Sequence, residues 1–350
     1  MPKTYLIVGA SRGIGLELTR QLLSHGHTVL ATCRAPTSTP PGNASKLWSL
    51  TGSPNGHNLA ILECDVSIPE SVKAFTEEVR KLGREGCVLE QGVIDVVVLN
   101  AGVLDYPNRI SEVSFPAFTH HIQTNTIGPL LTASSLLSLS SPSSPQFPPP
   151  SHFPSPFPSP SHQPKSPTTP LLPTIPIQIH TLAFISSDSG SASRFLSYED
   201  GFGAYSVSKA ALNQGLRHLA CELQRQVQTQ TQHQDIGEFP SSSSSSGPGS
   251  GGQSGVGGSG LGIRSEKGKR EASKAPVVLA IHPGEVATDM ASGVGTDLAW
   301  EIEGIIGVEE SVRGVLGVIE EKGWGGVDEG GGNGKGEAMF WDWRGGVYPW

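Results

Sequence analysis

Short apolar runs alternate with amphipathic stretches along most of the chain. Residues 4–8 form an apolar run that stops at Gly9, and such runs are typical of strands buried in a parallel sheet. Over residues 14–25 the apolar positions recur at helical spacing, and Gly26 follows as a helix-ending glycine. Residues 28–32 are apolar and β-branched again. The pattern therefore predicts a β-α-β unit at the start of the chain.

The same alternation continues toward the last residues. The predicted strands are residues 59–63, 94–99, 177–186, 277–282 and 338–342, and the predicted helices are residues 69–82, 115–137 and 204–226. Ser67 is the expected N-cap of the helix that begins at Pro69. Repeated strand-helix units imply a parallel, doubly wound sheet, so the predicted fold class is α/β and Rossmann-like.

Two polar segments separate some of these elements. Residues 139–176 are dominated by Ser and Pro, and residues 227–275 by Gln, Ser and Gly. Because such segments cannot build an apolar core, we expect polyproline or flexible conformations there. About 260 residues remain without them, a normal size for one α/β domain. The interpretation is a single domain over residues 1–350 with two low-complexity inserts, of which the first could bind a proline-reading partner.

Composition argues against several classes of protein. A formal charge of -8 makes nucleic acid an unexpected partner. The four cysteines have no metal-ligand spacing, which is typical of reduced thiols in a cytosolic protein, and no metal is expected. Prolines and serines break the longest uncharged stretch, and no signal-peptide pattern precedes the first strand. We therefore expect a cytoplasmic protein that does not enter a membrane.

A glycine-rich turn links the first predicted strand to the first helix. In Gly9-Ala-Ser-Arg-Gly13-Ile-Gly15 the glycines allow a tight turn and let backbone amides approach a pyrophosphate at the helix N-terminus. The second strand ends without the acidic residue that binds the ribose in NAD-specific proteins. The guanidinium groups of Arg12 and Arg34 instead suit a 2′-phosphate. The predicted cofactor is therefore NADP(H).

Three further motifs stand where predicted strands end. They are Asp65-Val66, Asn100-Ala101-Gly102, and Pro283-Gly284 followed by Val286 and Thr288. The carboxyl ends of parallel strands meet at one edge of the sheet, where open α/β folds bind ligands. These motifs are therefore expected to lie around the same cleft as the glycine turn.

Tyr205 and Lys209 are four residues apart, so they share one face of a predicted helix. The pKa of a free tyrosine is near 10. A nearby ammonium group and an oxidised nicotinamide should lower this pKa and favour proton exchange at neutral pH. The strand before this helix ends in Ile185-Ser186-Ser187, which brings a hydroxyl group toward the pair.

These motifs, in this order, resemble the classical short-chain dehydrogenases/reductases over nearly the whole chain apart from the inserts. The ending from Phe340 to Trp350 is similar to that of C-factor/sniffer-like carbonyl reductases, although Arg344 intervenes before its glycine. The resemblance implies an NADP(H)-dependent oxidoreductase that interconverts a small-molecule carbonyl and an alcohol. It also implies a homo-oligomer, either a dimer or a tetramer.

The resemblance assigns a role to each candidate catalytic residue. Tyr205 would exchange the proton, and Ser187 would hydrogen-bond the carbonyl oxygen of the substrate. Lys209 would assist Tyr205 and hold the nicotinamide ribose. Asn125 would anchor a water behind the lysine. The residues expected to contact the cofactor are Gly9, Ser11, Arg12, Gly13, Ile14, Gly15, Arg34, Asp65, Val66, Asn100, Ala101, Gly102, Tyr205, Lys209, Pro283, Gly284, Val286 and Thr288.

Eighteen positions separate Ser187 from Tyr205, so the loop over residues 188–203 is longer than is usual in the family. Ser186 and Ser189 therefore stay open as alternatives to Ser187. The substrate loop is expected at residues 289–306, where Met290, Leu298 and Trp300 would form an apolar wall.

Other functions also stay open. One is a non-catalytic, NADP(H)-binding regulatory protein of the same fold, and another is an interaction scaffold that works through the first insert. The glycine spacing disfavours an extended-type epimerase or dehydratase. The sequence does not identify the substrate.

Overall fold

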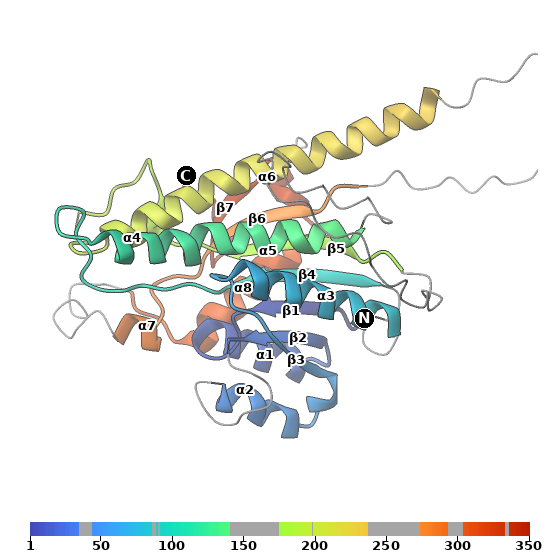
Figure 1. Cartoon of the computed structure of the whole chain (residues 1–350), viewed down its shortest axis with the longest axis horizontal. Coiled ribbons are helices and arrows are strands. Elements are labelled where there is room, and N and C mark those ends of the chain that lie inside the picture. Colours follow the sequence, from blue (N-terminus) through green and yellow to red (C-terminus); the bar gives the residue numbers. More distant parts are fainter. Residues whose placement is uncertain are drawn as a thin grey trace, which may run out of the picture.

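A parallel sheet of seven strands forms the centre of the computed structural model, in the order β3-β2-β1-β4-β5-β6-β7 (Figure 1). The strands are β1 (Thr4–Val8), β2 (Thr28–Cys33), β3 (Leu59–Glu63), β4 (Val93–Leu99), β5 (Gln178–Ile185), β6 (Val277–His282) and β7 (Met339–Asp342). The structure describes residues 1–34, 44–85, 89, 92–140, 175–197, 199–236, 274–292, 304–332 and 336–350. The strand order reverses between β1 and β4, so the sheet is doubly wound and the predicted Rossmann-like α/β fold is confirmed.

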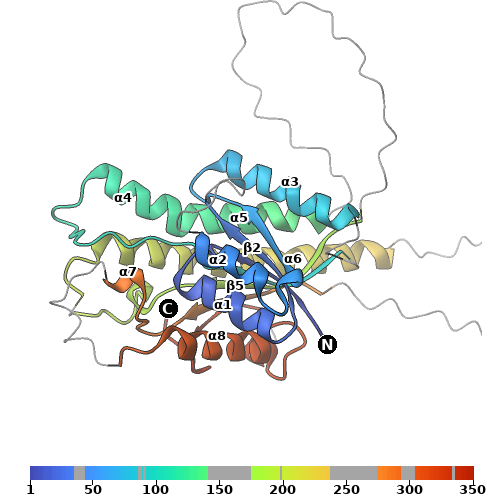
Figure 2. The ribbon, with the colours of Figure 1, turned by 90° about the horizontal axis from the view of Figure 1, so that it is seen from below.

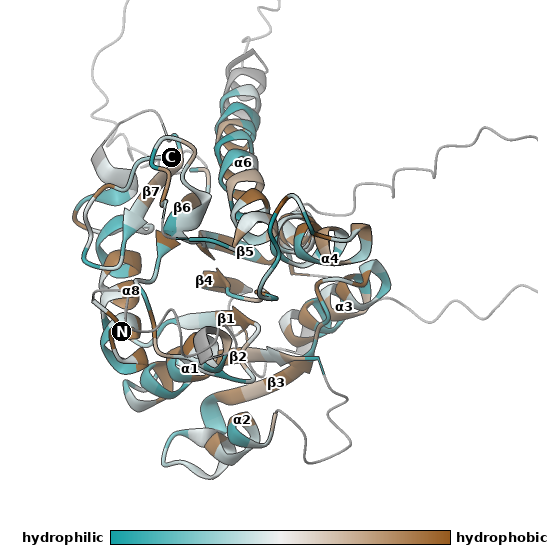
Figure 3. Ribbon diagram, turned by 90° about the vertical axis from the view of Figure 1, so that its left-hand side faces the viewer, coloured by the Kyte–Doolittle hydropathy of each residue, from teal (hydrophilic) through white to brown (hydrophobic). Residues whose placement is uncertain are grey.

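Helices cover both faces of the sheet. They are α1 (Gly13–Ser24), α2 (Ser45–Ser49), α3 (Pro69–Glu85), α4 (Phe115–Ile122), α5 (Gly128–Leu137), α6 (Gly203–Ile236), α7 (Asp289–Ser292) and α8 (Val308–Lys322). Short 3₁₀ turns occupy Leu50–Gly52, Gly56–Asn58, Ser138–Ser140, Asp188–Gly190 and Glu329–Gly332. Helices α3, α4 and α6 lie on one side of the strands, and α1 and α8 lie on the other (Figures 2 and 3). No helix in these ranges is long and apolar enough to cross a membrane.

The alternation of side chains along each strand explains the two layers. In β1, Leu6 and Val8 belong to the core beneath α3, α5 and α6, whereas Tyr5 and Ile7 belong to the core beneath α1 and α8. All four side chains are fully buried. Burial of one large aliphatic side chain contributes about 1.5–3 kcal/mol. The β1 strand therefore contributes side chains to the cores on both faces of the sheet. It can do so because every position in this run is apolar.

All seven predicted strands are present, with ends that differ from the prediction by one residue or none. The predicted helix over residues 115–137 contains a π-helical turn, Gln123–Ile127, between α4 and α5. Ser67 does not cap α3, because the helix begins two residues later and the Ser67 hydroxyl donates to the Asp65 carboxylate at 2.6 Å.

Helix α6 continues to Ile236, ten residues into the predicted second insert, and projects past the sheet (Figure 1). Residues 227–236 contain neither glycine nor proline, so nothing in their sequence ends the helix before Gly237. The rest of this insert, up to residue 273, and residues 141–174 of the first insert lie outside the described residues.

Helices α2 and α8 had no counterpart in the sequence-based prediction. Glycines at positions 314 and 317 obscure the helical pattern of α8. Packing explains the glycine at position 314, because a Cβ there would stand 2.3 Å from the carbonyl oxygen of Trp343. The apolar face of α8 nevertheless packs on the sheet through Val312, Val315 and Ile319.

Candidate active site

The glycine turn after β1 has the geometry of a phosphate cradle. Gly9 and Gly13 adopt positive φ angles of 90° and 55°, which favour glycine. A Cβ on Gly15 would stand 2.1 Å from the carbonyl oxygen of Gly9. Arg12 occupies the N-cap of α1 in extended conformation, and no side chain caps this helix end. The first backbone N–H groups of α1 are therefore available to an anion.

Hydrogen bonds fix this turn to the neighbouring strand ends. The Asn100 side-chain amide donates to the carbonyl oxygen of Gly9 at 2.7 Å, and the Gly9 amide donates to Thr32 Oγ1 at 2.9 Å. Asn100 thus has a structural task at the end of β4 besides lining the cleft.

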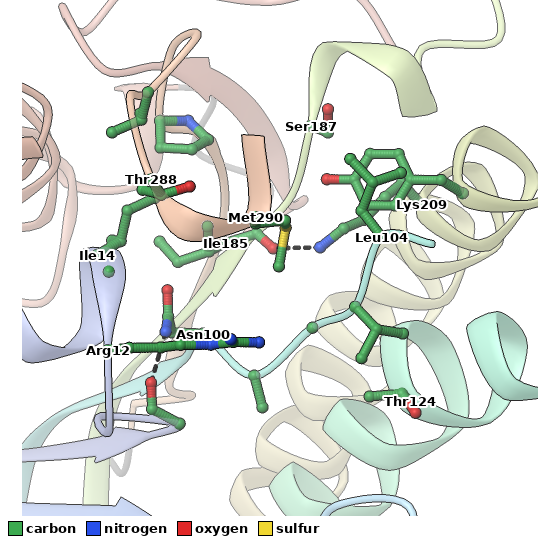
Figure 4. A pocket seen from close by; sticks show the side chains of 18 of the residues that line it. Arg12, Ile14, Asn100, Leu104, Thr124, Ile185, Ser187, Lys209, Thr288 and Met290 are labelled. Carbon is green, nitrogen blue, oxygen red and sulfur yellow. Dashed lines mark hydrogen bonds between the residues drawn. The ribbon is translucent and has the colours of Figure 1, made fainter. Parts of the chain in front are cut away.

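One pocket at the carboxyl edge of the sheet gathers nearly all the residues that the motifs singled out. Of the predicted cofactor contacts, every residue except Gly15 lines it. Gly15 is buried behind the turn, where it allows the close approach to Gly9. Ser187, Tyr205 and Lys209 line the same pocket, whereas Asn125 does not (Figure 4).

Lys209 reaches the pocket from the first turns of α6. Its side chain is only 5% exposed, and its ammonium group donates to the carbonyl oxygen of Ile185 at 2.9 Å (Figure 4). Burial lowers the pKa of Lys209 to about 8. The ammonium nitrogen lies 5.7 Å from the centre of the Tyr205 ring, so the two side chains share one helix face as the spacing predicted.

The surrounding protein raises the pKa of Tyr205, and the lowering expected from an oxidised nicotinamide stays a prediction. Burial raises this pKa, and the negative charges of Asp188, Glu285 and Glu199 raise it further, while a hydrogen bond with Ser187 opposes the shift. The ammonium group of Lys209 lies 5.7 Å from the centre of this ring and donates to the end of β5. Tyr205 therefore holds its proton at neutral pH.

Ser187 lies at the end of β5 beside Tyr205. Its hydroxyl contacts the carboxylate of Asp188 at 3.1 Å and the hydroxyl of Ser189 at 3.2 Å. The hydroxyls of the two alternative serines form hydrogen bonds with other side chains. Ser186 donates to the side chain of Asn213 at 2.6 Å, and Ser189 donates to Glu199 at 2.5 Å. Of the three hydroxyls, that of Ser187 affects the pKa of Tyr205, which it lowers.

Asn125 lies in the π-helical turn and is fully buried. Its side chain accepts from the amide of Val103 and donates to the carbonyl of Val103, both at 2.8 Å, and also donates to Ser208 Oγ at 3.0 Å. A Cβ on Gly102 would stand 3.3 Å from Asn125 Oδ1 and 3.7 Å from Lys209 Nζ. Asn125 thus sits behind the pocket near the lysine, and its water-anchoring role stays a prediction.

The sequence reasoning missed two carboxyl groups that line the pocket, those of Glu199 and Glu285. Within the described ranges Asp188, His282 and Glu285 place potential metal-ligand atoms within 4.8 Å of one another. Within this group the Asp188 amide donates to His282 Nδ1 at 3.2 Å, and the same nitrogen lies 3.5 Å from a carboxylate oxygen of Asp188. Of the predicted substrate wall, Met290 lines the pocket, while Leu298 and Trp300 lie outside the described residues.

Residues 3–142, which contain the glycine turn, Asn100 and Asn125, match the family model described as short chain dehydrogenase. This match covers less than half of the chain, and the N-terminal part of the protein is similar to short chain dehydrogenases. An uncharacterized oxidoreductase of Schizosaccharomyces pombe is 35% identical over 129 residues, which cover 36% of this chain and 44% of that relative. The matched segment thus spans less than half of that relative, and the family-model match ends before Tyr205.

Solved structures are similar in fold to the whole chain. The NADPH-bound carbonyl reductase from chicken fatty liver aligns with a TM-score of 0.59 and 24% identity, covering 100% of this chain and 99% of that one. Carbonyl reductase Sniffer of D. melanogaster aligns with a TM-score of 0.59 and 20% identity, covering 100% of both chains. These structures share the Rossmann-like architecture of this chain.

Proposed function

We propose that this chain is an NADP(H)-dependent carbonyl reductase with Tyr205 as its general acid and base. The observation that carries the proposal is that Ser187, Tyr205 and Lys209 line the pocket that also holds the glycine turn, with the Lys209 ammonium nitrogen 5.7 Å from the centre of the Tyr205 ring. Ser187 would donate to the carbonyl oxygen of a substrate and thereby orient it. Tyr205 would then lie beside that same oxygen.

The pocket residues fit a dinucleotide that carries a 2′-phosphate. The uncapped end of α1 and the close approach at Gly15 suit a pyrophosphate. Arg12 and Arg34 are exposed and line the pocket, where their guanidinium groups would pair with the phosphate. The chicken liver enzyme, which has the same fold, is described as NADPH-bound. The cofactor would supply a hydride to the carbonyl carbon of the substrate.

The protonation state of the site favours reduction. Because burial and the nearby carboxyls raise the pKa of Tyr205, its hydroxyl carries a proton before the reaction begins. This proton would pass from Tyr205 Oη to the substrate oxygen as negative charge develops there, leaving a phenolate. The Lys209 ammonium would stabilise that phenolate, and Asn125 would hold the loop that ends β4 in place.

NADPH oxidation across a panel of ketones and aldehydes tests this proposal. Tyr205→Phe should lower kcat by about a thousandfold while NADPH binding, followed by nucleotide fluorescence, stays unchanged. Tyr5→Phe is the matched control, because Tyr5 is buried in β1 and does not line the pocket. If the wild type binds NADPH, turns over no carbonyl and behaves like Tyr205→Phe, the chain is instead a non-catalytic nucleotide-binding protein.

The remaining expectations belong to the same proposal. A homo-oligomer is expected, and light scattering would distinguish a dimer or tetramer from a monomer. A cytoplasmic location is also expected, and a fluorescent fusion to the full chain would test it.

A further inference from the structure

The pocket has an acidic wall, formed by Glu199 and Glu285, beside the proposed reaction centre. Glu199 belongs to the long loop between Ser187 and Tyr205, and Glu285 belongs to the turn after β6. Both carboxyls lie close enough to the Tyr205 hydroxyl to affect its pKa. Two segments far apart in the sequence thus bring acidic groups to the place where a substrate carbonyl would bind.

Neither carboxyl has a cationic partner among the residues that the structure describes. Glu199 accepts a hydrogen bond from Ser189, and Glu285 is hydrogen-bonded to Asp188. The ion pairs within the described ranges involve other acids. Lys209 lines the same pocket but directs its ammonium group to a backbone carbonyl oxygen. The acidic wall is therefore short of positive charge.

This arrangement is electrostatically unfavourable without a ligand. Burial, followed by the charge of Asp188, raises the pKa of Glu199 to about 7 and that of Glu285 to about 8. The other titratable and charged groups around the wall are Asp188, Tyr205, Tyr348, His282 and the Arg194 guanidinium; burial lowers the pKa of His282 and raises those of Tyr205 and Tyr348. A cation at the wall would favour the ionised carboxyls and relieve their repulsion.

The pocket also offers surfaces for the rest of such a ligand. Phe202 lines it, with its ring centre 6.5 Å from that of Tyr205 and 5.5 Å from that of Tyr106. An aromatic face next to carboxylates is a combination that binds ammonium groups. Leu104 and Met290 supply apolar surface for alkyl carbons.

We infer that the substrates are carbonyl compounds with a positively charged nitrogen close to the carbonyl group, as in amino ketones and amino aldehydes. The ammonium group lies against Glu199 and Glu285, while the carbonyl oxygen lies between Ser187 and Tyr205. This inference rests on the proposed reductase function and adds the class of substrate.

A pair of ketones of matched shape tests the inference. Acetonyltrimethylammonium and 4,4-dimethylpentan-2-one differ only in that a cationic nitrogen replaces a carbon atom. The quantity to measure is the ratio of their kcat/KM values in the wild type and in Glu199→Gln, Glu285→Gln and the double variant. Comparing ratios between variants cancels the different intrinsic reactivity of the two ketones. Glu222→Gln, on the exposed face of α6, is the matched control.

The expected result is a ratio that falls by about tenfold or more in the double variant, mainly through KM of the cationic ketone. The neutral ketone and the Glu222→Gln control should change little. An unchanged ratio in the double variant would overturn the inference even if both ketones are reduced. If neither ketone is reduced by any variant, the proposed reductase function fails instead.

Calorimetric titration of the cationic ketone into the protein with NADP⁺ provides a readout without turnover. The trimethylammonium group does not titrate, whereas Glu199 and Glu285 lose their protons near pH 7 and pH 8. Affinity should therefore rise between pH 6 and about pH 8.5 in the wild type and stay flat in the double variant. A flat profile in the wild type would contradict the inference. Thermal unfolding of each single variant identifies any misfolded protein.

Discussion

Replacement of Lys209 by methionine should stabilise the fold while it removes activity. Lys209 is buried, and its ammonium group has one hydrogen bond, to the carbonyl oxygen of Ile185. No carboxylate in the described part of the chain forms an ion pair with it. Methionine has a similar length and carries no charge, so Lys209→Met removes the desolvated ammonium without opening a large cavity.

The size of the effect follows from the lowered pKa. A fall in the pKa of Lys209 from 10.5 to about 8 corresponds to a cost of about 3 kcal/mol for the charged form in the folded protein. Loss of the hydrogen bond to Ile185 offsets about 1 kcal/mol of the gain. We therefore expect Lys209→Met to unfold with a free energy about 2 kcal/mol above that of the wild type at neutral pH.

The stability that Lys209→Met gains over the wild type should decrease as pH rises. Below pH 8 the lysine is protonated in both states, so the folded protein bears the full cost of the buried charge. Between pH 8 and 10.5 only the unfolded chain still binds the proton, so the wild type becomes more stable as pH rises. Above pH 10.5 the lysine is neutral in both states and the electrostatic gain of the variant disappears.

Urea unfolding of the nucleotide-free protein at pH 7 and near pH 10.5 measures both effects. Lys73→Met, at an exposed position on α3, is the matched control and should change stability little at either pH. A Lys209→Met protein that is less stable than the wild type at pH 7 would refute the reasoning. So would a gain that is equally large at both pH values.

Four further substitutions test separate parts of the structure. Gly15→Ala places a Cβ 2.1 Å from the carbonyl oxygen of Gly9, so thermal unfolding should show a lower Tm and NADPH should bind about tenfold more weakly; Gly317→Ala in α8, where a Cβ meets no atom, should instead add about 0.5–1 kcal/mol to stability. Arg34→Gln should lower the preference for NADPH over NADH by about tenfold, measured as the ratio of KM values, and an unchanged ratio would remove Arg34 from the phosphate site. Tyr5→Phe removes a buried hydroxyl that has no hydrogen-bond partner in the described part of the chain, so urea unfolding should show a stability that is unchanged or up to about 1 kcal/mol higher.

The sequence alone determined the strands, the glycine turn and the class of fold. Buried parallel strands read as continuous apolar runs, so β1, β3 and β6 were predicted with the same first and last residues that the structure has. The turn from Gly9 to Gly15 is a local structure whose backbone angles and close contacts select glycine. Such features depend on neighbours in the chain, and a pattern can therefore reveal them.

The tertiary structure decided the properties that depend on distant neighbours. The direction of the Tyr205 pKa shift follows from burial and from acids on the loops after β5 and β6, while Lys209, four residues away, turns to Ile185 instead. Asn125 acquires its partners only where the end of β4 meets α6. The acidic wall exists because the loop before α6 and the turn after β6 converge beside Tyr205. No local pattern encodes such convergence, since each carboxyl alone is an ordinary acidic residue and its pKa depends on the surrounding fold.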